Sequence, residues 1–123
     1  MSKKYLDLVN EAKRNIKEIS ISETRKMIDQ KAAFYFVDIR EESEWNENRI
    51  PGAIYIGKGI LEREIEKSIQ DENSTIILYC GGGYRSALSA ENLQRMGYKN
   101  VFSMMGGISE WKEKRYPINS GKV

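Results

Sequence analysis

Short apolar segments rich in β-forming residues alternate along this chain with segments whose apolar residues recur at helical spacing. The segments 34–39 and 75–79 predict buried strands, since near-continuous aromatic and β-branched residues are typical of the middle of a parallel sheet. The segments 5–19, 61–69 and 86–96 predict helices with one apolar face. This alternation indicates an α/β fold, an open sheet of about five mainly parallel strands with helices on both faces.

Helix ends are marked by local signals. A further helix is predicted to begin after Ser20 or Ser22, because Glu23 stands three residues after Ser20 as in a capping box. Gly97 predicts a left-handed end for the helix before it. The remaining predicted elements are short helices over 41–47 and 108–114 and short strands over 53–56 and 100–103.

The chain has 123 residues, which supports one domain, and no repeat or low-complexity tract divides it. We expect residues 1–19 to form a helical extension packed on a domain over 20–118, followed by a short tail over 119–123. The apolar stripe of the extension is expected to pack on the sheet. The alternative is an interaction surface for a partner or a second copy of the chain.

Composition excludes several classes of protein. No stretch approaches the roughly 20 apolar residues of a membrane span, and the first residues lack the apolar core of a signal peptide, so we expect a cytoplasmic protein with no membrane contact. The single cysteine excludes an internal disulfide, and the absence of histidine excludes His-based metal sites and Cys-His pairs within one chain. The net charge is only +2, without a dense basic block, so no nucleic acid partner is expected.

The loop that begins at the only cysteine carries the strongest functional signal. Cys80 directly follows the predicted strand 75–79, at the strand end where parallel α/β sheets bind ligands. Three glycines permit positive φ, so successive amides can turn inward as an anion-binding nest, and a helix N-terminus and an arginine add positive charge. These groups stabilise a thiolate without a histidine. We expect Cys80 to be catalytic, with substrate bound by Gly81, Gly82, Gly83, Tyr84, Arg85 and Ser86.

A structural interpretation competes with each of these signals. A lone cysteine at a strand end is typical of a small core residue, and three glycines are typical of a mobile turn. The combination of the cysteine, the glycines and an arginine before a helix favours a functional role for this loop over a purely structural one. Tyr84 is predicted either to shape the entrance or to anchor the loop. Trp45, Trp111, Met104 and Met105 are predicted to pack in the core, and the glutamates of 41–47 to form a solvated face.

Four segments resemble the rhodanese-type sulfurtransferases, in the order of that family. Cys80 to Ser86 resembles the active-site loop, with four residues between the cysteine and the arginine. The other three are Asp38-x-Arg40 with the acidic segment up to Trp45, Ile50-Pro51-Gly52-Ala53, and Gly106-Gly107 up to Trp111 followed by Tyr116-Pro117. One departure is Asn48-Arg49, where the family commonly has Gly-His; the turn is expected to survive, since Asn tolerates left-handed conformations.

The resemblance implies a rhodanese-like fold and a thiosulfate sulfurtransferase activity that needs no cofactor or metal. Cys80 would take a sulfane sulfur from thiosulfate or a persulfide donor, and its persulfide would pass the sulfur to cyanide or a thiol acceptor, a thioredoxin-like protein being one candidate. Arg40 is a candidate substrate-binding residue, the alternative being an ion-pair brace with Asp38.

The sequence is compatible with three other functions. A sulfur-relay carrier would deliver the persulfide sulfur to a protein partner. Phosphatases and arsenate reductases of similar fold have five residues between the cysteine and the arginine, so the shorter loop here disfavours them. An inactive binding module would keep the fold without turnover, although such modules typically lack the cysteine.

Overall fold

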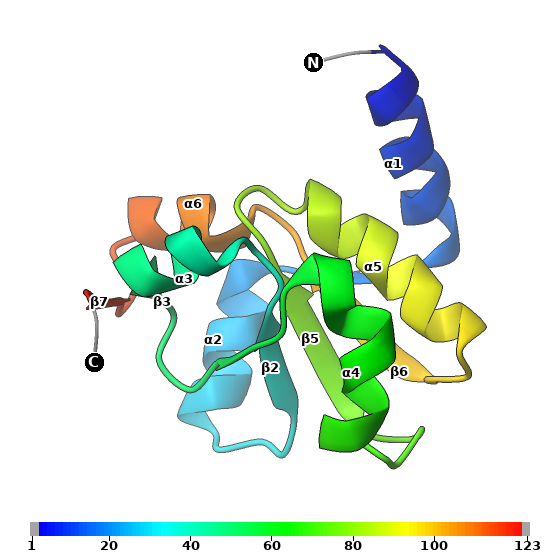
Figure 1. Ribbon diagram of the computed structural model, residues 1–123. Helices are drawn as coiled ribbons and strands as arrows, with labels where there is room; N and C mark the ends of the chain where they lie inside the picture. The colour runs from blue at the N-terminus through cyan, green and yellow to red at the C-terminus, as the bar shows by residue number, and fades with distance from the viewer. Residues whose placement is uncertain (1–2, 122–123) are drawn as a thin grey trace.

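The computed structural model describes residues 3–121 and contains a five-stranded, wholly parallel sheet (Figure 1). The strand order is β1-β6-β5-β2-β4, so β5 lies at the centre of the sheet. This arrangement confirms the predicted α/β fold. The strands are β1 (Lys17–Ile19), β2 (Tyr35–Asp38), β4 (Ile54–Tyr55), β5 (Thr75–Tyr79) and β6 (Asn100–Met104).

Helices cover both faces of the sheet, because side chains alternate between the two faces along each strand. On one face, Ile76 and Leu78 of β5 pack with α4 (Leu61–Ser68) and α5 (Tyr84–Arg95). On the other face, Ile77 and Tyr79 pack with α2 (Ile21–Asp29) and α6 (Gly107–Glu113). None of the helices within residues 3–121 combines the length and apolar character needed to cross a membrane.

The capping predictions agree with the structure. Ser20 caps α2, its hydroxyl accepting a hydrogen bond from the Glu23 amide at 3.0 Å while the Glu23 carboxylate accepts from the Ser20 amide at 3.1 Å. Gly97 follows α5 with a φ of +105°, in the left-handed region that glycine adopts freely. Both ends were readable in the sequence because the interactions that form them are local.

Short elements outside the five-stranded sheet follow β2 and β4, at the same end of the parallel strands as the cysteine loop. They are α3 (Glu42–Glu47), β3 (Asn48–Arg49) and the 3₁₀ helix η1 (Lys58–Ile60). β3 pairs antiparallel with β7 (Asn119–Ser120), so the expected tail over 119–123 contains a strand. The Arg49 guanidinium strengthens this pairing by donating to the Gly121 carbonyl at 3.0 Å.

Helix α1 (Lys3–Asn15) packs against α5 and not on the sheet, which corrects the predicted packing of its apolar stripe (Figure 1). Val9 and Ala12 are its buried residues. The helix is also shorter than the predicted 5–19, since Lys17–Ile19 forms β1 and pairs in parallel with β6. Ile19 matches the helical spacing of the preceding apolar residues, so the sequence pattern did not reveal the change to a strand.

Candidate active site

Cys80 follows the last residue of β5 and begins the loop that leads into α5. This loop lies above the upper end of β5 in Figure 1. Its sulfur accepts hydrogen bonds from the backbone amides of Gly83 at 3.2 Å and Ser86 at 3.4 Å. The residue is only 1 % exposed, so its sulfur is buried. Two inward-turned amides at the start of a helix can stabilise a negative charge on this sulfur.

The three glycines of the loop have different roles. Gly83 alone among them has a positive φ, +95°, and a Cβ there would lie 3.3 Å from the amide nitrogen of Gly106. A Cβ at Gly81 would lie 3.1 Å from an Arg85 guanidinium nitrogen, whereas a Cβ at Gly82 would meet nothing within 4 Å. The expectation of a loop that needs positive φ therefore applies to Gly83.

Arg85 lies beside the loop and is held by an acidic partner from α3. Its guanidinium donates to the two carboxylate oxygens of Glu44, at 2.8 and 3.3 Å. These hydrogen bonds lower the pKa of Glu44 and raise the pKa of Arg85. The sequence interpretation assigned Glu44 to a solvated helix face, and no local signal relates it to an arginine 41 residues away.

Ser86 and Ser103 form a buried hydroxyl pair below the first turn of α5. Their Oγ atoms are 2.7 Å apart, and Ser86 Oγ is 3.6 Å from the sulfur of Cys80. Neither serine has any exposed surface. Ser103 of β6 was missed in the sequence; the only signal was a hydroxyl residue within a mainly apolar predicted strand.

Arg40 is engaged in a buried brace between β2 and β3. Its Nε lies 3.0 Å from each Asp38 carboxylate oxygen, and a terminal nitrogen donates to Asp38 at 2.7 Å and to the Asn48 carbonyl at 2.6 Å. Burial would lower the pKa of Arg40, but the hydrogen bonds and charge of Asp38 outweigh it and raise the pKa. This geometry supports the brace, and substrate contact by Arg40 stays a prediction.

The aromatic residues near the loop pack in different ways. Tyr84 is half-buried, and its ring contacts the Tyr5 ring of α1 edge-on at 6.2 Å with the Lys13 ammonium 5.3 Å from its centre. This contact supports the interpretation of Tyr84 as an anchor. Trp111 is a core residue as predicted, and Trp45 is half-buried against Tyr55, with ring centres 5.4 Å apart.

The predicted packing of the two methionines is half right. Met104 is fully buried as predicted, but Met105 is 41 % exposed, so its predicted core position is wrong. Met105 follows the last residue of β6, where alternation along the strand no longer places side chains in the core. Its amide still donates to the Ile19 carbonyl at 2.9 Å, so the backbone continues the pairing with β1 while the side chain faces outward.

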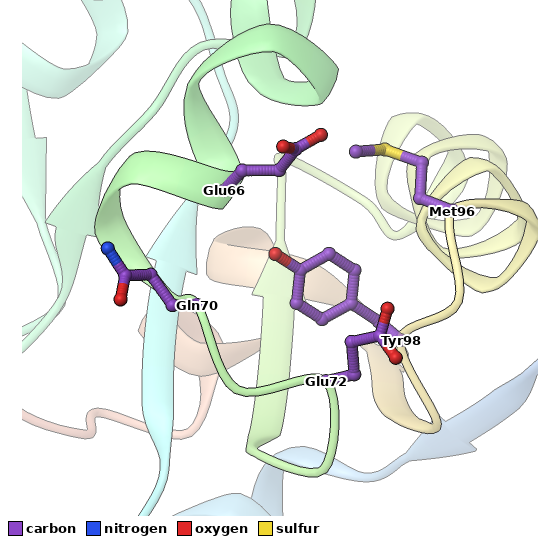
Figure 2. Close-up of a pocket in the computed structure, with 5 residues that line it drawn as sticks. All are labelled: Glu66, Gln70, Glu72, Met96 and Tyr98. Atoms are coloured by element: carbon purple, nitrogen blue, oxygen red, sulfur yellow. The ribbon is translucent and has the colours of Figure 1, made fainter.

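A pocket of about 320 Å³ lies at the opposite end of the strands from the cysteine loop, between the C-terminal ends of α4 and α5 (Figure 2). The pocket is lined by the carboxylates of two glutamates and by three other side chains, namely Glu66, Glu72, Gln70, Met96 and Tyr98. The Tyr98 hydroxyl is occupied, since it donates to the Ile69 carbonyl at 2.6 Å. The carboxylates disfavour an anionic substrate, and the part of the chain described here contains no cluster of potential metal ligands.

Comparison with known proteins decides the family. The rhodanese-like domain family matches residues 20–114 of the chain. The chain belongs to this family. A Coxiella burnetii relative, the thiosulfate sulfurtransferase GlpE, is 29 % identical over 78 % of this chain and 87 % of its own length. YtwF of Bacillus subtilis, whose name describes a sulfurtransferase, is 31 % identical over 85 % of this chain and 98 % of its own.

Two further relatives extend the comparison of this rhodanese-like chain. YrkF of Bacillus subtilis, named as a sulfur carrier protein, is 29 % identical over 81 % of this chain, which spans only 53 % of the length of YrkF. The structure of RPA3614 from Rhodopseudomonas palustris, described as a protein of unknown function and possible tyrosine phosphatase, is 28 % identical with a TM-score of 0.87. The aligned region covers 97 % of this chain and 96 % of the RPA3614 chain. The family and its named relatives support sulfur transfer as the class of activity.

Proposed function

We propose that this rhodanese-like protein moves a sulfane sulfur from thiosulfate or a persulfide donor, through a persulfide on Cys80, to cyanide or a thiol acceptor. The observation that carries this proposal is the setting of the only cysteine. Its sulfur accepts from the amides of Gly83 and Ser86, with the Arg85 guanidinium beside the same loop. A stabilised thiolate beside a cation is what attack on a small anionic sulfur donor requires.

The first half-reaction loads the sulfur. The Cys80 thiolate attacks the outer sulfur of thiosulfate, a new S–S bond forms, and the original S–S bond breaks with its electron pair leaving on sulfite. The product is a Cys80 persulfide whose negative charge lies on the outer sulfur. Arg85 would hold the anionic donor, since a guanidinium binds oxyanions through two parallel hydrogen bonds.

The second half-reaction delivers the sulfur. The acceptor attacks the outer sulfur of the persulfide, and Cys80 leaves as a thiolate with the electron pair of the broken bond. Cyanide becomes thiocyanate, and a thiolate acceptor becomes a persulfide. The amides of Gly83 and Ser86, which donate to the sulfur of Cys80, would stabilise the negative charge of this leaving group.

A second candidate function follows from the similarity to YrkF, which is named as a sulfur carrier. In this case the persulfide forms but reacts with a protein thiol, such as that of a thioredoxin-like protein, in preference to cyanide. Phosphatase activity is less well supported. The amides of Gly83 and Ser86 converge on the sulfur itself, and four residues between Cys80 and Arg85 leave less space than five for a tetrahedral phosphate.

The steady-state rate of thiocyanate formation tests the proposal. Thiosulfate and cyanide are varied together, with Ser89→Ala as a matched variant because Ser89 is buried on α5 and its hydroxyl makes no hydrogen bond to the sulfur. We expect the parallel double-reciprocal lines of a ping-pong reaction, unchanged in the control variant and absent in Cys80→Ser. Persulfide formation without thiocyanate favours the relay function. Hydrolysis of p-nitrophenyl phosphate without either product would overturn sulfur transfer.

A further inference from the structure

The side chains of Cys80 and Ser86, from one loop, and of Ser103, from β6, form a chain of polar contacts below α5. Ser103 Oγ of β6 lies 2.7 Å from Ser86 Oγ of α5, which lies 3.6 Å from the sulfur of Cys80. All three residues are at most 1 % exposed, so bulk water does not replace these contacts. A hydroxyl has a single hydrogen to donate. The direction of one hydrogen bond in this chain of contacts therefore determines whether the next atom donates or accepts.

The charge on Cys80 sets that direction. A neutral thiol donates to Ser86 Oγ, and the Ser86 hydroxyl is then free to donate to Ser103. A thiolate has no hydrogen, so the lowest-energy arrangement has Ser86 donating to the sulfur while it accepts from Ser103. Ser103 is held rigidly for this role, since its strand pairs with β5 on one side and with β1 on the other.

We infer that Ser103 is a positioning residue that turns the Ser86 hydroxyl toward the sulfur of Cys80. A thiolate would then have three donors. Two are the amides of Gly83 and Ser86, and the third is the Ser86 hydroxyl, whose oxygen lies 3.6 Å from the sulfur. A hydrogen bond accepted by Ser86 also polarises its hydroxyl and strengthens the bond that it donates. Ser103 acts through Ser86, because the hydroxyl of Ser86 lies between it and the sulfur.

The consequence for catalysis rests on the proposed function. The Cys80 thiolate is the nucleophile when sulfur is loaded and the leaving group when sulfur is delivered. Added hydrogen bonds lower the basicity of a thiolate, which weakens it as a nucleophile but makes it a better leaving group. Loss of the Ser103 hydroxyl is therefore expected to slow delivery of sulfur to the acceptor more than loading from the donor.

The test uses the only cysteine of the chain and needs no sulfur transfer. The rate of Cys80 alkylation by iodoacetamide is measured against pH, because the thiolate is the reacting form. Ser86→Ala is expected to move the profile to higher pH, and Ser103→Ala to move it in the same direction by about 0.5 pH unit, or roughly threefold in rate at neutral pH. The double variant is expected to match Ser86→Ala, since Ser103 acts through Ser86.

Ser89→Ala is the matched control. Ser89 lies on α5, has no exposed surface, and its hydroxyl has no hydrogen-bond partner among residues 3–121. Its profile is expected to coincide with that of the wild type. A Ser103→Ala profile equal to the wild type, or additive shifts in the double variant, would overturn the inference. Shifted profiles in a protein that forms no thiocyanate would uphold the role of Ser103 while refuting the proposed sulfur transfer.

Discussion

The Arg85 guanidinium and the Glu44 carboxylate form a two-point ion pair, with N–O distances of 2.8 and 3.3 Å, that joins the start of α5 to α3. Both side chains are about one-third exposed, at 33 % and 36 %. The carboxylate fixes the guanidinium beside the Cys80 loop and offsets part of its charge. A donor anion that binds Arg85 therefore meets a pre-oriented cation next to a negative group.

Glu44→Gln should destabilise the protein in a pH-dependent manner. Because the hydrogen bond from Arg85 lowers the pKa of Glu44, the ionised carboxylate stabilises the fold above its unfolded pKa of about 4.3, and this stabilisation is lost as pH falls through the lower folded value. We expect a loss of about 0.5–1 kcal/mol at pH 7, since the pair is partly exposed. The measurement is urea unfolding from pH 7 to pH 2.

Glu47→Gln is the matched control for this change. Glu47 lies on α3 and is exposed, and its carboxylate has no hydrogen bond or ion pair among the residues that the structure describes. It should leave the free energy of unfolding within about 0.5 kcal/mol of the wild type. A loss in Glu44→Gln that persists unchanged at acidic pH would contradict an electrostatic origin.

Arg85→Ala should weaken thiosulfate turnover, with most of the effect on KM. Removing charge-assisted hydrogen bonds to an anion costs about 1.5–3 kcal/mol, so kcat/KM should fall about 10- to 150-fold. The kcat/KM of Arg85→Lys should fall less, because lysine keeps the positive charge although it cannot form two parallel hydrogen bonds. Arg95→Ala on the same helix, 74 % exposed, should retain wild-type kinetics. An unchanged KM in Arg85→Ala would exclude donor binding by this residue.

Gly83→Ala and Gly82→Ala should differ sharply although the two positions are adjacent. A side chain at Gly83 is strained by a φ of +95° and crowded by the Gly106 amide, so we expect a loss of about 1–2 kcal/mol together with reduced activity. Gly82 has free space and should tolerate alanine within about 0.5 kcal/mol. Thermal unfolding and thiocyanate formation measure both effects. Equal losses at the two positions would refute this account of the loop.

Asp38→Asn should be the most destabilising of these changes. It leaves the Arg40 guanidinium, 4 % exposed, without its charged partner, and breaking a buried pair costs about 3–5 kcal/mol. Asp29→Asn removes a surface partner of Arg25 and should cost at most about 0.5 kcal/mol. Urea unfolding at neutral pH compares the two variants. A similar loss for both would show that the Asp38–Arg40 pair is no stronger than a surface pair.

The sequence predicted the parts of the molecule that local patterns determine. The strand Thr75–Tyr79 and the loop from Cys80 to Ser86 are contiguous, so strand propensity, glycines and a following helix could be read together. The capping box of Ser20 and Glu23 is equally local. These features are encoded within a few residues and do not depend on the rest of the fold.

The parts that sequence reasoning missed depend on contacts between distant residues. Glu44 meets Arg85 across 41 positions, and Ser103 meets Ser86 across 17. The strand Lys17–Ile19 is defined by pairing with β6, at the far end of the chain, and its own residues continue a helical pattern. Each partner looks ordinary alone: a glutamate on a charged helix, a serine in a strand, a short polar segment.

Loading of sulfur on Cys80 is tested most directly by the intact mass of the protein after incubation with thiosulfate, in the wild type and in Cys80→Ser. We expect the wild type to gain the mass of one sulfur atom on Cys80 and to lose it when cyanide is added, with release of thiocyanate. Cys80→Ser is predicted to do neither. Absence of any added sulfur on Cys80 after treatment with thiosulfate and with a low-molecular-weight persulfide would refute sulfur transfer through this cysteine.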